Sequence, residues 1–254
     1  MSTSEGAATG AARGGLAAQS AGFLDYLDRF LAELPARSLE DVVVRAGGPQ
    51  GVALVAVDVV NGFCTSGPLA SARVGAIVPG IEALFRAAYD AGVRAMAVLR
   101  DSHDPQAPEF AQFGPHCLAG SAESALVEPL SRLPFASSLA DVPKNATSAW
   151  TGATHFPAWV AEQERAGVGT FIVVGDCTDL CVYQTAMPLK LGANARNRPL
   201  EVIVPAEGVD TYDLPEDTAR SLGAMPHPGD LLHAVFLYHL QLNGVQVVRR
   251  LTTL

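Results

Sequence analysis

The sequence has little cysteine, a deficit of basic charge and no long apolar run. Four cysteines in 254 residues do not resemble the disulfide framework of a small secreted domain, so we expect a reducing, cytoplasmic setting. The net charge of −9, from 17 basic and 26 acidic side chains, argues against a nucleic acid partner. No apolar run approaches the roughly 18 residues that a membrane span requires, so no membrane association is expected.

The N-terminal part differs in composition from the rest of the chain. Residues 1–19 are mainly Ala, Gly and Ser, and we predict that they are disordered. They lack the arginines of a transit peptide and the apolar core of a signal peptide. Apolar side chains recur at helical spacing from Ala21 and stop near Pro35, so residues 20–50 are predicted to be a helical extension. We expect this extension to pack on the domain or on a neighbouring subunit.

Residues 51–254 alternate between strand and helix patterns and are predicted to form a single domain. The predicted strands are residues 52–60, 94–100, 170–174, 201–205 and 245–251. The predicted helices are residues 77–91, 156–165, 180–192, 215–222 and 229–243, with an irregular stretch from 101 to about 145. This alternation predicts an α/β fold: three α/β/α layers around a mainly parallel, doubly wound sheet.

Residues 170–186 carry the clearest sign of chemistry. A β-branched run ends at Gly175, and a helix capped by Thr178 or Asp179 carries Cys181 in its first turn. The positive end of the helix dipole favours the nucleophilic thiolate, and backbone N–H groups of the same turn can stabilise an oxyanion. The alternative is an inert buried cysteine, but a place at the carboxyl end of a strand favours function.

Two charged side chains fit a role beside this cysteine. Asp58 ends an apolar run, where an ionised carboxylate is costly unless it is paired. It is either a cap or a general base with an adjustable pKa. Lys144 is either a surface lysine or a cation that lowers the pKa of Cys181 and holds Asp58. The histidine of the Pro-His-Pro turn, His227, is expected to be structural.

A group of metal-ligand residues follows the second predicted strand. Asp101 and His103 alternate on an extended segment and therefore point the same way. With His116 from a nearby loop they offer two nitrogens and one oxygen, a set that suits zinc, iron or manganese. Glu109 lies between them as a further or water-bridged ligand. The alternative interpretation of Asp-x-His is a surface turn.

Several of these motifs, taken in order, resemble those of the isochorismatase-like cysteine hydrolases. The matching segments are Asp58-Val-Val-Asn61-Gly-Phe63, Lys144 and Gly175-Asp-Cys-Thr-Asp179-Leu-Cys181-Val. Asp101-Ser-His103 and Gly114-Pro-His116-Cys-Leu-Ala-Gly120 narrow the resemblance to the metal-containing nicotinamidases. Residues 192–197, 211–215 and 224–228 are similar to the plant-type nicotinamidases, and the resemblance covers roughly residues 51–254.

The resemblance implies a role for each matching position. Cys181 matches the nucleophile, Asp58 the proton acceptor and donor, and Lys144 the third member of the triad. The matched metal ligands are Asp101, His103, His116 and Glu109. The backbone N–H groups of Cys177 and Cys181 match the oxyanion hole, and Asp176–Cys177 matches a cis peptide bond. Phe63 and Trp150 match aromatic residues that flank a pyridine ring.

The activity that the resemblance implies is hydrolysis of nicotinamide to nicotinate and ammonia through a thioester. The substrate of such an enzyme is a small pyridine carboxamide, and the reaction belongs to NAD salvage. The cofactor is one divalent metal ion, for which zinc is preferred over iron or manganese. Such proteins usually form homo-oligomers. The alternatives are another amidase of the superfamily, acting on a carbamoyl or ureido substrate, and a non-catalytic binding protein of the same fold.

Overall fold

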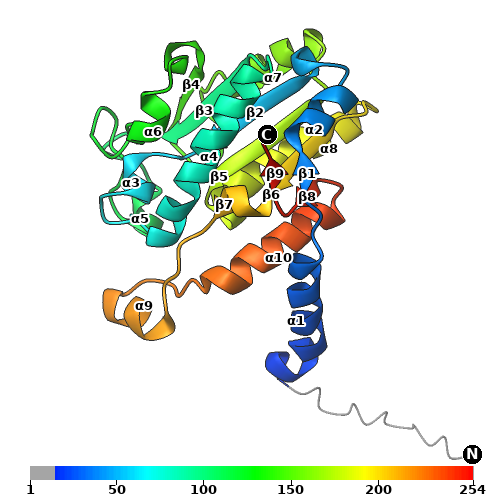
Figure 1. Ribbon diagram of the computed structural model, residues 1–254. Helices are drawn as coiled ribbons and strands as arrows, with labels where there is room; N and C mark the ends of the chain where they lie inside the picture. Colours follow the sequence, from blue (N-terminus) through cyan, green and yellow to red (C-terminus); the bar gives the residue numbers. More distant parts are fainter. Residues whose placement is uncertain (1–14, 254) are drawn as a thin grey trace, which may run out of the picture.

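The computed structural model describes residues 15–253, and its centre is a seven-stranded sheet in which every pairing is parallel (Figure 1). Six strands follow the order β4-β3-β2-β5-β6-β8, and the short β7 pairs with the end of β5. Their bounds are β2 Val52–Val57, β3 Ala95–Asp101, β4 Ala140–Lys144, β5 Thr170–Asp176, β6 Glu201–Pro205, β7 Val209–Asp210 and β8 Gln246–Val248.

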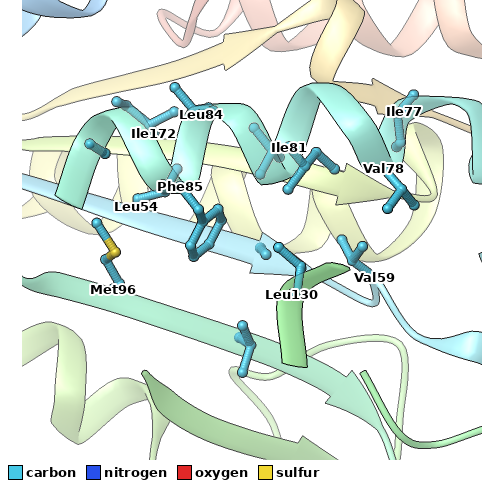
Figure 2. Close-up of a cluster of buried hydrophobic side chains, with 14 of the residues drawn as sticks. Leu54, Val59, Ile77, Val78, Ile81, Leu84, Phe85, Met96, Leu130 and Ile172 are labelled. Carbon is cyan, nitrogen blue, oxygen red and sulfur yellow. The ribbon is translucent and has the colours of Figure 1, made fainter. Parts of the chain in front are cut away.

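Helices cover both faces of the sheet, which confirms the predicted three-layer architecture. On one face, α4 (Ala72–Asp90) lays Ile81 and Phe85 over Leu54 and Ile172 (Figure 2). The opposite face packs on α7 (Phe156–Arg165), α8 (Tyr183–Ala195) and α10 (Gly229–Leu242). Both faces of β2 and β5 are buried, which explains why their sequences are continuous apolar runs rather than alternating ones.

The N-terminal extension packs on its own domain. Its helix α1 (Leu16–Ala32) lies against α10, and the rings of Phe23, Tyr26 and Phe30 surround Tyr238. The predicted disorder is wrong for residues 16–19, which are helical, and residues 1–14 lie outside the described part. The chain continues into β1 (Arg37–Ser38), which pairs with β9 (Leu251–Thr252), and into α2 (Leu39–Arg45).

Several predicted boundaries are wrong for identifiable reasons. The strand predicted for residues 52–60 ends at Val57, because Asp58 turns the backbone with φ of +54°. The strand predicted for residues 245–251 is split between β8 and β9, which belong to different sheets. The irregular stretch contains β4 and the short helices α5 (Phe110–Phe113) and α6 (Glu128–Ser131). Within residues 15–253, the helices are all too short or too polar to cross a bilayer.

The order of the strands reverses at β2. The chain runs outward from β2 to β3 and β4, then returns to place β5 on the other side of β2. In open parallel sheets, this reversal leaves a crevice at the carboxyl ends of the two central strands, where ligands bind. The residues that follow β2, β3, β4 and β5 therefore meet at one end of the sheet.

Candidate active site

Four predicted site residues lie at that end of the sheet. Asp58 follows β2, while Asp101, Lys144 and Asp176 are the last residues of β3, β4 and β5. All four are buried, with at most 2% of each residue exposed. Asp101 and Lys144 are partners in the parallel register of β3 and β4, so their side chains share one face of the sheet.

Lys144 joins the group together. Its Nζ lies 2.8 Å from Asp58 Oδ2 and 3.6 Å from Cys181 Sγ, and it also donates to Asp101 Oδ1. A buried ammonium needs such partners, because an unpaired charge in the interior is strongly unfavourable. The burial of Lys144 between two carboxylates and a thiol excludes the surface interpretation, and it brings Lys144 into contact with both other residues of the expected triad.

The carboxyl of Asp58 is held on both sides. Its Oδ1 accepts from the backbone N–H of Asp101 at 2.8 Å, and Oδ2 faces Lys144. Burial and the nearby negative charge of Asp101 raise its pKa to about 6, although Lys144 lowers it. A carboxyl in that range can take up and return a proton near neutral pH.

Cys181 lies in a π-helical turn, Thr178–Val182, between β5 and α8. Burial raises the pKa of its thiol well above the usual range, and the attraction of Lys144 only partly opposes this effect. This direction is opposite to the lowering predicted from the helix terminus and Lys144, so formation of the nucleophilic thiolate calls for a nearby base. The turn follows a cis peptide bond between Asp176 and Cys177.

Beside Lys144, four side chains converge as a possible metal centre. One nitrogen or oxygen from each of Asp101, His103, Glu109 and His116 lies within 4.8 Å of the others. Asp101 Oδ2 is 3.3 Å from His103 Nε2 and 3.7 Å from His116 Nε2, and Glu109 Oε1 is 3.9 Å from His103 Nε2. All four predicted ligands are therefore brought together.

The donor set fits a divalent ion. The Nδ1 atom of His116 lies 2.8 Å from Gly114 O, and that of His103 lies 3.3 Å from Asn145 Oδ1. Nδ1–H groups donated to these oxygens leave both Nε2 lone pairs directed at the cluster, as in many metal-bound histidines. His103 Nε2 is buried without a hydrogen-bond partner among the described residues, which is the state expected of a metal ligand.

The aromatic residues near the site include two that the sequence did not single out. Phe63 lies on α3 (Asn61–Cys64) with its ring 5.6 Å from that of His116. Trp150 packs on Phe156, and its Nε1 donates to a carbonyl of α8 one turn after Cys181. Phe110 and Phe113 were missed, and they place rings 5.6 and 6.3 Å from His116. Their position in the sequence, between the predicted ligands Glu109 and His116, is a signal that could have identified them.

Fold and site together define a doubly wound parallel α/β protein. A buried group of Asp58, Lys144 and Cys181 lies beside four candidate metal ligands, which we call the metal-type donors: Asp101, His103, Glu109 and His116. Residues 52–230 match the isochorismatase domain, so the chain belongs to the isochorismatase family. The chain is also 32% identical over 243 residues to Nicotinamidase 1 of Arabidopsis thaliana, covering 89% of this chain and 96% of that protein.

Solved structures with this fold include nicotinamidases from two bacteria. The pyrazinamidase/nicotinamidase of Streptococcus mutans is 24% identical with a TM-score of 0.59, over 78% of this chain and 99% of that one. The nicotinamidase of Bacillus subtilis is 24% identical with a TM-score of 0.58, with the same coverage. N-carbamoylsarcosine amidase of Thermoplasma acidophilum is 22% identical with a TM-score of 0.56, over 78% and 95%. At these identities the structures establish the shared fold alone.

Proposed function

We propose that this protein is a nicotinamidase, which hydrolyses nicotinamide to nicotinate and ammonia in NAD salvage. The observation that carries the proposal is the contact of Lys144 with Asp58, Asp101 and Cys181, because it joins a nucleophile and its base to a set of metal-type donors. The 32% identity to a nicotinamidase along nearly the whole of both chains supports it. We also propose a cytoplasmic homo-oligomer, as the family resemblance implies.

The first half of the reaction uses the raised pKa of Asp58. Its carboxylate takes the Cys181 proton as sulfur attacks the carboxamide carbon, with Lys144 in contact with both groups. The N–H groups of Cys177 and Cys181 are the donors that we assign to the developing oxyanion. Asp58 then returns its proton to the leaving nitrogen, which gives ammonia and a thioester on Cys181.

In the second half, Asp58 accepts a proton from water as the water oxygen attacks the thioester. Collapse of this adduct releases nicotinate, and Asp58 returns its proton to the leaving sulfur, which restores the Cys181 thiol and the Asp58 carboxylate. We assign Phe63, beside His116, and Trp150, beside α8, to the two sides of the pyridine ring. Asp101, His103, Glu109 and His116 would hold a divalent ion, and zinc is our first choice over iron or manganese. The ion would act as a Lewis acid that binds and orients the pyridine nitrogen.

The donor set separates this function from its nearest alternative. A carbamoyl or ureido substrate has no ring nitrogen that could bind a metal ion, so an amidase for such substrates would gain little from one. The convergence of all four candidate ligands beside Lys144 therefore favours the pyridine substrate.

The test is release of ammonia from nicotinamide by the purified, metal-loaded protein. Cys181→Ala is expected to lower kcat at least about 10³-fold, because loss of a nucleophile removes the covalent route. Cys64→Ala serves as the matched control, since Cys64 is a buried thiol of α3 outside the triad. A Cys181→Ala protein that hydrolyses nicotinamide at an appreciable fraction of the wild-type rate would overturn the mechanism. Turnover of ureido or carbamoyl amides in place of nicotinamide would overturn the substrate assignment.

A further inference from the structure

A buried carboxylate with no part in the mechanism lies in the same turn as the nucleophile. Asp179 precedes Cys181 by two residues and follows Cys177 by two. Its Oδ1 accepts from Thr211 Oγ1 at 2.6 Å, and its Oδ2 lies 2.8 Å from His227 Nε2. Asp179 and His227 are each about 8% exposed, so this pair is largely removed from water.

Both ring nitrogens of His227 face acceptors. Nε2 faces the Asp179 carboxylate, and Nδ1 lies 2.8 Å from the carbonyl oxygen of Tyr212. A neutral imidazole carries one N–H group, so only the imidazolium can donate to both oxygens. Burial lowers the pKa of His227, but the contact with Asp179 outweighs it and the pKa is above its usual value. Burial raises the pKa of Asp179, and the bonds from His227 and Thr211 bring it below the usual value.

His227 is itself fixed in place. Its backbone N–H and C=O pair with Leu214 in an antiparallel bridge, with both hydrogen bonds 2.8 Å long. The ring of Tyr212 stacks on the imidazole with centroids 3.7 Å apart and planes 16° apart. The histidine is therefore a rigid donor, and the turn that carries Asp179 rests against it.

Other charges near this pair belong to α4, α10 and β7. Arg73 of α4 binds Asp210 of β7 at 2.9 Å and also Asp230 of α10. His233 of α10 lies 2.9 Å from Thr178 Oγ1, and burial lowers its pKa. The direct charged partner of His227 among the described residues is Asp179.

We propose that His227 is a positioning residue, which as an imidazolium holds Asp179 and thereby fixes the turn that presents Cys181 and its neighbouring N–H groups. This inference rests on the proposed function and adds to it a residue that does not touch the reacting atoms. Loss of the His227 proton at alkaline pH leaves either Asp179 or the Tyr212 carbonyl facing a lone pair. The turn is then less firmly held, so kcat falls while KM changes little, because Phe63 and the metal-type donors lie outside this pair.

The experiment compares His227→Gln with His155→Gln in metal-loaded protein. Glutamine can keep one N–H donor toward Asp179 but carries no charge, and His155 is an exposed residue at the start of α7. We expect His227→Gln to lower kcat about 10-fold, with KM within about 2-fold, and to remove the alkaline fall in kcat. His155→Gln is expected to keep the wild-type profile. A His227→Gln protein with the kcat and pH profile of His155→Gln overturns the proposal, even if it unfolds more easily.

A second measurement keeps this proposal separate from the proposed function. Alkylation of Cys181 by iodoacetamide, followed at that residue by mass spectrometry, reports the turn without any substrate. We expect its pH profile to change in His227→Gln and not in His155→Gln, whether or not nicotinamide is hydrolysed. If His227→Gln fails to fold, NMR titration of His227 in the unaltered protein decides. A pKa at or below about 6.5, the ordinary histidine value, overturns the proposal.

Discussion

At the scale of single residues, Asp58 and Asp101 show how two buried carboxylates share one cation. Each places an oxygen on Lys144, and the second oxygen of each has a separate task. Asp58 Oδ1 accepts from the Asp101 N–H, and Asp101 Oδ2 faces His103 and His116. Burial raises the pKa of Asp101, but Lys144 and the two histidines outweigh it and hold the pKa below its usual range. Asp101 thus stays ionised, while Asp58 can exchange a proton.

The pH dependence of catalysis follows from this difference. The mechanism needs Asp58 as a carboxylate, so kcat/KM is expected to fall as the pH drops through its pKa. Because that pKa is raised to about 6, the acid limb should lie above the ordinary aspartate value of about 3.9. A pH series of ammonia release from nicotinamide measures it. An acid limb at or below pH 4 would contradict the assignment of Asp58.

Asp58→Asn is the matched variant for this measurement. The amide oxygen can still accept from the Asp101 N–H, so the local geometry is kept while the base is lost. We expect kcat/KM to fall by about 10²–10⁴, the usual contribution of a general base, with no acid limb left in the profile. Retention of the wild-type limb in Asp58→Asn would assign that limb to another group.

At the scale of elements, the site depends on how closely β5 approaches β2. Gly175 pairs with Val57, the residue before Asp58, and has φ of +115°. A Cβ atom built on Gly175 would lie 1.9 Å from the carbonyl oxygen of Val57, which is far inside van der Waals contact. Glycine is therefore required for both its backbone angle and its size. Its position sets Asp58 and the Asp176–Cys177 peptide side by side.

Gly175→Ala is expected to damage stability and activity together. The backbone conformation alone costs about 1–3 kcal/mol for a residue with a side chain, and the clash with Val57 adds to it. A shift of β5 by about 1 Å would also misplace Cys181 and lower kcat by about 100-fold. Urea unfolding and ammonia release measure the two effects.

Gly80→Ala on α4 is the matched control. Apart from its chain neighbours and the backbone of α4, no atom of residues 15–253 lies within 4 Å of a Cβ built there, and alanine is favoured over glycine in helices by about 1 kcal/mol. This variant should gain stability and keep its activity. Equal stability of the Gly175→Ala and Gly80→Ala proteins would refute the role given to Gly175.

The elements also show what the sequence can and cannot predict. The strands β2, β3, β5 and β6 are predicted from their apolar runs. Strands that are covered on both faces of a sheet are apolar along most of their length. The strand β4 was missed, because it is an edge strand with charged residues and Pro143. Asp58, Asp101 and Cys181 were singled out because each lies near the carboxyl end of a predicted strand, whereas the triad and ligand set as a whole rest on the family resemblance. The two roles of Asp101 were not predicted, since spacing does not show which carboxylate oxygen faces which partner.

At the scale of the whole molecule, the segment that follows α1 meets the last strand of the described chain. The strand β1 pairs with β9, and α1 packs on α10, so the extension is tied to the last helix and the last strand (Figure 1). The site lies at the carboxyl ends of β2 to β5, which are brought together by the reversal of strand order. Four separate segments thus supply the metal-type donors and the triad, and each is fixed only in the folded chain.

A metal that binds only these assembled donors must stabilise the whole fold. At 100 times its dissociation constant, such an ion adds about 2.7 kcal/mol, because the unfolded chain does not bind it. For a chain of this size each kcal/mol raises Tm by about 2–4 °C, so zinc added to chelated protein should raise Tm by about 5–10 °C. We expect His103→Ala to lose both the bound ion, measured by elemental analysis, and this rise in Tm. His155→Ala should keep both, since that side chain lies on the surface. An unaltered protein that neither retains an ion nor responds to zinc, iron or manganese would exclude the metal centre while leaving the Asp58, Lys144 and Cys181 group intact.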